Sequence, residues 1–242
     1  MRAIILAAGV SRRLYPITWN TAKSLLEVGG KSIIDHQISA LIENGITDIT
    51  IVVGYFREKL MKHVSDTHPE ANFDFVVNHH YFETNTAHSL EMCRRQMVAE
   101  PILLMNADVL YPKQLLTRVI KSEYPTVLAV EIKRCGREEV KVIEGEHRRI
   151  VAIGKELIQE NSLGEFIGVA KFSTEFNQLF ATSLKHLIDG GGKADYFEAA
   201  IQPLLSKTNV YYEDVSDMPC VEIDFIEDLD KARDLVKSKW FD

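Results

Sequence analysis

The chain has 242 residues, 46% of them hydrophobic, which is enough to bury a full core and favours one α/β domain over residues 1–242. Its 28 Lys and Arg against 35 Asp and Glu give a net charge of −7. This balance argues against a nucleic acid partner, because binding a phosphate backbone needs surplus cations. No run approaches the roughly 20 apolar residues of a membrane helix, so we expect a cytoplasmic protein with no membrane partner. Cys93, Cys135 and Cys220 lack metal-ligand spacing, which predicts reduced thiols.

The first half of the chain alternates strands with helices. Apolar runs predict strands at 2–8, 48–53, 73–78 and 101–106, and apolar stripes at helical spacing predict helices at 31–44, 57–65 and 86–97. Repeated strand–helix–strand order requires crossover connections. It therefore predicts a mainly parallel sheet.

The second half begins with a different pattern. Short strands are expected at 126–133, 140–144, 149–154 and 166–172, with little helix between them, which predicts an antiparallel insertion or a curled edge covering a pocket. Further segments follow in chain order: helices at 174–188 and 194–206, a strand pair near 210–212 and 220–223, and a terminal helix at 227–239. No proline- or serine-rich linker interrupts this order, so a single domain is expected.

The first predicted strand leads into a turn of small residues followed by cations, LAAGVSRR. In an open parallel sheet, ligands bind beyond the carboxyl ends of the strands. Ala7, Ala8 and Gly9 would let a base or phosphate approach the main chain closely. Arg13 and then Lys23 supply charge suited to phosphate oxygens. The turn carries neither the dinucleotide glycine fingerprint nor a Walker A loop.

Several motifs along the chain carry a family likeness. LAAGVSRRLYPIT, NTAKSLLEV and GGKSIIDHQI, followed by VVGY, NTAHSL, NADV, YFEAAIQPLL and VEIDFIEDLDKA, resemble the signature of nucleotidyltransferases of the nucleoside-diphosphate-sugar and phosphocholine type. The likeness runs over nearly the whole chain. The tail and the NTAHSL helix are most similar to the CTP:phosphocholine cytidylyltransferase branch.

This resemblance implies a fold and a reaction. The fold would be a Rossmann-like, glycosyltransferase-A-type three-layer sandwich, with a mixed, mainly parallel central sheet and a small antiparallel insertion. The reaction would be attack of a phosphomonoester oxygen on the α-phosphorus of a nucleoside triphosphate, CTP first of all, with pyrophosphate leaving. A sugar-1-phosphate uridylyl- or thymidylyltransferase and a non-catalytic nucleotide-sensing module are the alternatives.

Two residues depart from the family pattern. Ser11 stands where the family has a second glycine, so the turn must accept a side chain, and we expect a negative φ there. Ala22 stands where the family has a proline, which would loosen the backbone ahead of Lys23. These departures motivate the sensing alternative.

Joining two phosphates brings anions together, so catalysis depends mainly on positioning and neutralisation. The resemblance implies that Arg13 binds the β- and γ-phosphates and that Lys23 lies near the α-phosphate and the monoester. Lys155, in AIGKEL, resembles a catalytic lysine of the sugar-phosphate members. Asp108 and Asp224 each follow a predicted strand and would hold Mg²⁺ together with phosphate oxygens.

The nucleotide is expected to contact the opening turn and one helix start. Asn85 and Ser89 are one helical turn apart and can share a face toward base and ribose, and Gly54 would let a ring lie flat on VVGY. The full expected set is Leu6, Ala7, Ala8, Gly9, Gly54, Asn85 and Ser89.

The acceptor would be a small phosphorylated alcohol, amine or sugar. For phosphocholine, a quaternary ammonium is usually bound by aromatic faces and a carboxylate. The carboxylates available are Glu222, Asp195 and Glu165, and the rings are Tyr196, Phe166 and Phe197. A polyol phosphate or a sugar phosphate stays open at this point.

Overall fold

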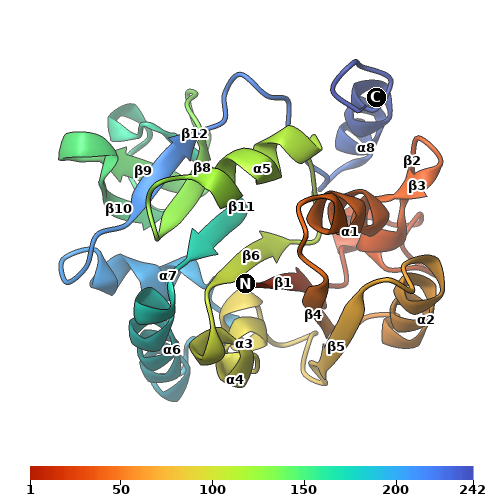
Figure 1. The fold of residues 1–242 in the computed structure, drawn as a ribbon, viewed down its shortest axis with the longest axis horizontal. Helices are drawn as coiled ribbons and strands as arrows, with labels where there is room; N and C mark the ends of the chain where they lie inside the picture. Colours follow the sequence, from red (N-terminus) through yellow and green to blue (C-terminus); the bar gives the residue numbers. More distant parts are fainter. Residues whose placement is uncertain (242) are drawn as a thin grey trace.

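A computed structural model describes residues 1–241. Its centre is one nine-stranded sheet in which the order β10-β9-β11-β6-β1-β4-β5 forms the main path, while β8 pairs with β11 and with β12 (Figure 1). The strands are β1 (Arg2–Ala7), β4 (Asp48–Val53), β5 (Asn72–Val77), β6 (Ile102–Asn106), β8 (Val127–Glu131), β9 (Lys141–Glu144), β10 (Ile150–Gly154), β11 (Gly164–Phe172) and β12 (Tyr211–Asp214). Strands β5, β4, β1 and β6 are parallel neighbours, whereas β11 runs antiparallel to β6, β8 and β9. The sheet is therefore mixed, with the antiparallel part contributed by the middle of the chain, as expected.

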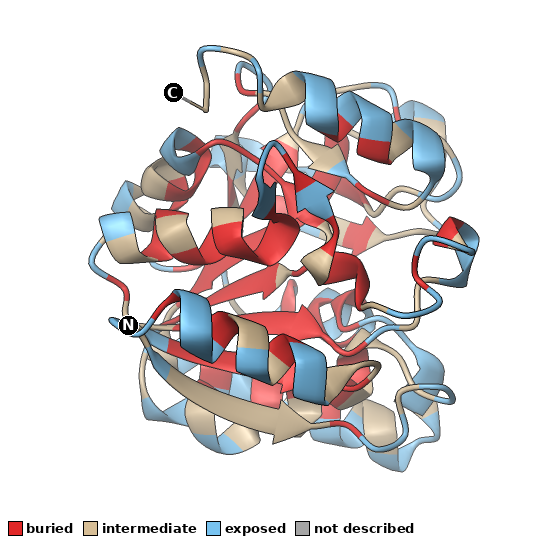
Figure 2. Cartoon of the chain, turned by 90° about the vertical axis from the view of Figure 1, so that its right-hand side faces the viewer, coloured by how far each residue is buried: buried red, intermediate tan, exposed pale blue. Residues whose placement is uncertain are grey.

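Helices cover both faces of this sheet. Alternate side chains of β1 point to opposite faces, so Ile4 and Leu6 join one apolar cluster while Ala3 and Ile5 join the other. The first cluster includes side chains of α3 (Thr86–Glu91), α4 (Arg94–Ala99), α6 (Thr174–Asp189) and α7 (Glu198–Ile201), and the second those of α1 (Ile33–Glu43), α2 (Arg57–Thr67) and α5 (Lys113–Lys121). Figure 2 shows the buried sheet between helices whose outer faces are exposed. The expected three-layer sandwich is confirmed.

A third apolar cluster supports the loops at one end of the sheet. It joins Leu14, Ile33, Ile223 and Leu229, and so packs α8 (Ile226–Leu235) against the opening turn and the hairpin β2–β3 (Glu27–Val28 and Lys31–Ser32). The opening turn therefore has its own buried anchor, Leu14, which is 0% exposed.

One helix was missed, and two predicted helices need correction. Helix α5 was not predicted, although Leu115, Leu116 and Val119 form a buried stripe at helical spacing. The helix expected at 86–97 is broken into α3 and α4 around Met92 and Cys93. The helix expected at 194–206 shrinks to α7 and a 3-10 turn, Gln202–Leu204, where Pro203 lacks an N–H for helical bonding.

The strand pair expected near 210–212 and 220–223 does not exist as a pair. Strand β12 instead extends the main sheet parallel to β8, whereas β13 (Val221–Glu222) pairs antiparallel with β7 (Val109–Leu110). The Ile223 N–H also donates to the Asp108 carbonyl oxygen at 2.9 Å. This small separate sheet joins the end of the chain to the residues that follow β6.

The expected negative φ at Ser11 is wrong. Ser11 has φ 54° and ψ 53°, a left-handed conformation that costs a residue with a Cβ free energy. The Thr18 hydroxyl donates to the Ser11 carbonyl oxygen at 3.0 Å, which holds this conformation. Ala22, in contrast, has φ −68°, the value that a proline ring would impose. The backbone before Lys23 therefore keeps the geometry of the family's proline.

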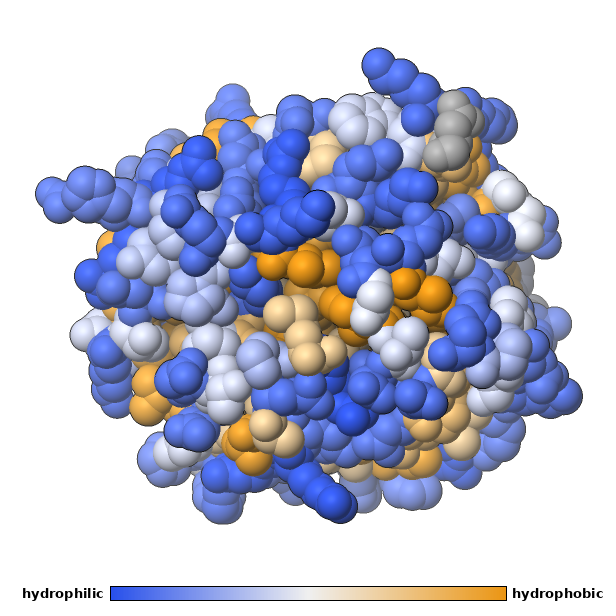
Figure 3. Space-filling view, viewed as in Figure 1, coloured by the Kyte–Doolittle hydropathy of each residue, from blue (hydrophilic) through white to orange (hydrophobic). Residues whose placement is uncertain are grey.

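The surface is mostly hydrophilic in the view of Figure 3, with apolar side chains gathered near the middle of that face. Within residues 1–241, no helix combines the length and the apolarity needed to cross a membrane.

Candidate active site

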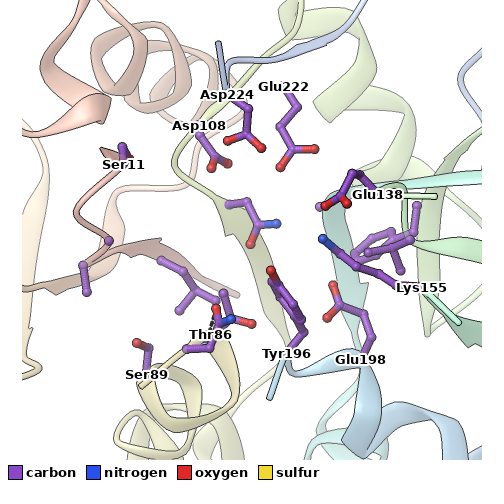
Figure 4. A pocket seen from close by; sticks show the side chains of 18 of the residues that line it. Ser11, Thr86, Ser89, Asp108, Glu138, Lys155, Tyr196, Glu198, Glu222 and Asp224 are labelled. Atoms are coloured by element: carbon purple, nitrogen blue, oxygen red, sulfur yellow. Dashed lines mark hydrogen bonds between the residues drawn. The ribbon is translucent and has the colours of Figure 1, made fainter. Parts of the chain in front are cut away.

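A cleft of about 410 Å³ opens at the carboxyl ends of the central strands (Figure 4). Main-chain and side-chain groups after β1 and β6 form one wall, and β11, the segment after β10 and the start of α7 form the opposite wall. A smaller hollow of about 50 Å³ shares Leu6, Gly9, Ser11 and Asp108 with this cleft. The cleft lies where a parallel sheet places its ligands.

Most of the residues expected at the site line this space. The cleft is lined by Leu6, Ala8, Gly9, Arg13, Asn85, Ser89, Asp108, Lys155, Tyr196, Glu222 and Asp224, and the smaller hollow by Ala7 and Lys23.

Gly54 and Asp195 lie outside this lining. A Cβ at Gly54 would lie 2.6 Å from the Ala8 carbonyl oxygen and 2.8 Å from Tyr81 Cβ, so the ring that Gly54 accommodates is that of Tyr81. Asp195 is exposed, and its carbonyl oxygen accepts from the Ala87 N–H at 3.2 Å. Both residues therefore have structural contacts instead of a place in the cleft.

Three carboxylates meet at one end of the cleft. Asp108, Glu222 and Asp224 each offer an oxygen, and these oxygens lie within 4.8 Å of one another. The pairing of β13 with β7 causes this, because Glu222 stands opposite Val109 in the register. Glu222 reaches solvent at the mouth of the cleft, yet desolvation by the surrounding protein and the like charges of Asp108 and Asp224 raise its pKa to about 8.

This acidic cluster fits a divalent cation. Mg²⁺ prefers oxygen ligands and needs few of them from the protein. Asp108 Oδ1 is buried and has no hydrogen-bond partner within the described residues, so it has a free lone pair to offer. The donor set and the crowding of negative charge both suit Mg²⁺ together with phosphate oxygens.

Two cations hold the acids together. Lys23 Nζ lies 2.8 Å from Asp108 Oδ2 and 2.8 Å from Asp224 Oδ1, and an Arg13 guanidinium N–H donates to Asp224 Oδ2 at 2.9 Å. Burial by itself would lower the pKa of Lys23, but the two carboxylates raise it to about 12. Lys23 therefore stays charged. The arrangement sets two fixed cations beside the acids that suit a metal ion.

The helix start opposite the opening turn carries the polar groups expected near the base and ribose. The Ser89 N–H donates to the Asn85 carbonyl oxygen at 3.2 Å, which confirms that the two residues are one helical turn apart. Asn85 Oδ1 accepts from the Thr86 N–H at 2.8 Å, and Ser89 Oγ accepts from Asn78 Nδ2 at 3.1 Å. Asn78 also lines the cleft and was missed, although it directly follows β5 as Asp108 follows β6.

The wall formed by β11 and α7 carries a second group of charges. Lys155 Nζ lies 4.3 Å from the centre of the Tyr196 ring, and Glu198 points into the cleft beside them (Figure 4). Sequence reasoning did not select Glu198, although a lone acid inside the apolar run YFEAAI is itself a signal. Phe166 and Phe197 are buried and pack edge to face with centroids 6.1 Å apart, so they belong mainly to the core.

Comparisons with known proteins identify the family. The sequence model of the family described as Nucleotidyl transferase matches residues 2–151. The chain is 26% identical to the choline-phosphate cytidylyltransferase of Streptococcus pneumoniae over 99% of this chain and 100% of that protein. It is also 26% identical to the CTP:phosphoglutamine cytidylyltransferase of Campylobacter jejuni, over 95% of this chain and 98% of the other.

Solved structures show the same fold. The structure of the CTP:phosphocholine cytidylyltransferase from Streptococcus pneumoniae superposes with a TM-score of 0.78 at 24% identity, covering 97% of this chain and 98% of that one. The inositol-1-phosphate CTP transferase from T. maritima superposes with a TM-score of 0.80 at 21% identity, covering 98% and 96%. With the family match covering more than half of its length, this chain belongs to the nucleotidyl transferase family and is a nucleotidyltransferase.

Proposed function

We propose that this nucleotidyltransferase transfers the cytidylyl group of CTP to a small phosphomonoester and releases pyrophosphate. One observation carries the proposal: Lys23 and Arg13 lie beside the acids Asp108 and Asp224 at one end of a cleft of about 410 Å³. The choice of CTP is supported by the two relatives that match nearly the whole chain, both of which are named as cytidylyltransferases. Their names also make phosphocholine and phosphoglutamine the first acceptors to test.

In this reaction an oxygen of the monoester attacks the α-phosphorus of CTP, and the bond from that phosphorus to the bridging oxygen of the β-phosphate breaks. Both reactants are anions, and negative charge grows on the departing pyrophosphate. Positioned cations therefore supply most of the catalysis.

The chain's own residues divide this task. Arg13 is placed to bind the β- and γ-phosphates, and Lys23 the α-phosphate and the incoming monoester. For this, both must exchange contacts with Asp224 for contacts with phosphate oxygens. Lys155, on the far wall of the cleft, adds a third cation. Burial would raise the pKa of Asp224, but Lys23 first, and then Arg13 and Lys155, hold it below its usual range.

Asp108, Asp224 and Glu222 would hold Mg²⁺. When bound, the ion would neutralise the charge of phosphate oxygens. The small residues Ala8 and Gly9 would let the nucleotide approach the main chain, and Asn85 and Ser89 would face base and ribose.

The test is pyrophosphate release in the presence of Mg²⁺, with each of the four nucleoside triphosphates combined with a panel of phosphomonoesters and sugar 1-phosphates. The proposal expects turnover with CTP. Turnover only with UTP or dTTP and a sugar 1-phosphate would replace it with the sugar-nucleotide alternative. Nucleotide binding that survives Asp108→Ala, without product in either protein, would favour the sensing module.

A further inference from the structure

Glu198 is a buried carboxylate with an unused oxygen in the wall of the cleft. The residue is 4% exposed, and Oε2 has no hydrogen-bond partner within residues 1–241. Leaving a buried acceptor without a donor costs free energy. Glu198 is one of the residues that line the cleft, and its side chain points into it (Figure 4), so a donor from a bound molecule can approach this carboxylate.

The position of Glu198 is rigidly supported. The Ser183 hydroxyl donates to the Ala200 carbonyl oxygen at 2.7 Å, which fastens α7 to α6. The Ile153 N–H donates to Gln202 Oε1, also at 2.7 Å, which fastens the end of α7 to β10. Glu198 therefore presents its oxygen from a fixed element, together with Lys155 at the end of β10.

The Tyr196 ring, which sequence reasoning placed around a quaternary ammonium, already has a cation on it. Lys155 Nζ lies 4.3 Å from the ring centre, the geometry of a cation–π pair. A second cation on this face would meet the charge of Lys155. Of the other rings expected there, Phe166 also lines the cleft but is buried edge to face against Phe197, and Phe197 lies in the core outside the lining.

The other acids of the cleft wall are exposed, paired or part of the acidic cluster. Glu138 is exposed, and its Oε2 lies 3.7 Å from an Arg13 guanidinium nitrogen. Glu165 Oε2 lies 2.6 Å from Lys133 Nζ, and Glu222 belongs to the acidic cluster with Asp108 and Asp224. Away from that cluster, Glu198 is the acid whose oxygen is buried at the cleft and free to accept within residues 1–241.

We infer that Glu198 determines acceptor specificity: its Oε2 accepts a hydrogen bond from a hydroxyl group of the acceptor, while Lys155 on the Tyr196 ring keeps a quaternary ammonium out. The enzyme thus prefers a polyol-type phosphomonoester to phosphocholine. This inference rests on the proposed function and narrows its acceptor. A trimethylammonium group has no N–H or O–H that could donate a hydrogen bond to Glu198, and its positive charge is repelled by Lys155. A hydroxyl group can donate to Glu198 and, being neutral, is not repelled by Lys155.

The test compares acceptors that differ at one group. Glycerol 3-phosphate carries hydroxyls, propyl phosphate has the same length without them, and phosphocholine carries the quaternary ammonium. With CTP and Mg²⁺, kcat/KM for glycerol 3-phosphate should exceed that of either other compound about 10- to 100-fold, the range expected when a buried acceptor gains or loses its donor. Phosphoethanolamine has N–H donors but also a positive charge, so its kcat/KM should lie between those of glycerol 3-phosphate and phosphocholine.

Variants assign the preference to Glu198. Glu198→Met should raise KM for glycerol 3-phosphate with KM for CTP unchanged, and should remove the advantage over propyl phosphate. Glu198→Gln keeps an acceptor oxygen, so it should retain part of the advantage of glycerol 3-phosphate over propyl phosphate that Glu198→Met loses. Glu123→Met, an exposed acid outside the cleft lining, is the matched control and should leave every ratio as in the wild type. Lys155→Met should raise kcat/KM for phosphocholine relative to kcat/KM for glycerol 3-phosphate.

Two results would overturn the inference while leaving the proposed function intact. One is phosphocholine turned over as well as glycerol 3-phosphate by the wild type. The other is an equal loss for all acceptors in Glu198→Met. Absence of pyrophosphate with every pair would contradict the proposed function itself. In that case, calorimetric titration of glycerol 3-phosphate and propyl phosphate in Mg²⁺ still tests the role of Glu198 in specificity. Equal affinity for the two compounds would refute that role. So would a preference for glycerol 3-phosphate that persists in Glu198→Met.

Discussion

Lys23 Nζ lies 2.8 Å from a carboxylate oxygen of Asp108 and equally close to one of Asp224. The ammonium thus joins an acid that follows β6 to an acid near the end of the chain. The same group that must neutralise phosphate holds the two acids in place before substrates arrive. Substrate binding is therefore an exchange of partners, and the next two predictions concern the residues that take part in it.

Replacing the ammonium should abolish most of the activity. Lys23→Met should lower kcat/KM for CTP about 10³-fold, because one positioned cation is worth this much in phosphoryl transfer. Pyrophosphate release measures it. Lys185→Met, at an exposed ion pair on α6, is the control and should behave as the wild type. Less than a tenfold loss in Lys23→Met would contradict the role given to Lys23.

The acidic cluster should make CTP binding depend on a divalent cation. With CTP present, Mg²⁺ should raise the melting temperature of the wild type, because a ligand bound only by the folded state stabilises it. The double variant Asp108→Asn, Asp224→Asn should not show this rise in melting temperature, and EDTA should reverse the rise in the wild type. A rise of the same size in the double variant would show that the ion binds elsewhere.

The left-handed conformation of Ser11 should cost stability. Ser11→Gly should stabilise the protein by up to about 1 kcal/mol, since glycine removes the Cβ clash but gains freedom in the unfolded chain. Ser11→Val should destabilise it. Urea unfolding measures both. As a comparison, Ser65→Gly inside α2 should lower stability by about 1 kcal/mol, so a loss in Ser11→Gly as well would refute the argument.

Asp35 should make the fold sensitive to acid. Burial alone would raise its pKa, but hydrogen bonds from His68, Ser32 and His63 hold it well below the ordinary 3.8. A carboxyl whose pKa is lower in the folded state stabilises the protein above the unfolded value and loses that contribution as the pH falls below it. Stability should therefore drop below about pH 4.

The matching variant is Asp35→Asn, which keeps the shape of the side chain. It should destabilise the protein by about 2 kcal/mol at neutral pH, the usual cost when buried hydrogen bonds to a charged group are weakened. It should also flatten the acid limb of the stability curve. An unchanged acid limb would show that other carboxylates govern acid unfolding.

Glu198 should give the opposite pH dependence. Burial raises its pKa to about 7, against the opposing effects of its backbone hydrogen bond and of Lys155. A carboxyl with a raised pKa stabilises the folded state while protonated, and that contribution is lost as the pH rises from 4.5 through about 7. Glu198→Gln should therefore melt higher than the wild type at about pH 8 but not at about pH 5. Equal differences at both values would contradict the shift.

The sequence by itself determined the local features of this protein. Continuous apolar runs marked β1, β4 and β6, because a strand buried on both faces has no polar side. The acids Asp108 and Asp224 could be selected because each comes just after a predicted strand, Asp108 two residues after 101–106 and Asp224 directly after 220–223. The helix at 113–121 was missed even though its apolar spacing is clear.

Only the tertiary structure decided how these pieces form a site. Arg13 and Asp224 are 211 residues apart, and they meet because β13 pairs with β7 instead of β12. The left-handed Ser11 and the free oxygen of Glu198 likewise depend on what surrounds them. Periodicity reports which face of an element is buried, whereas strand partners, backbone strain and unsatisfied polar atoms arise from contacts between distant segments, which no local pattern encodes.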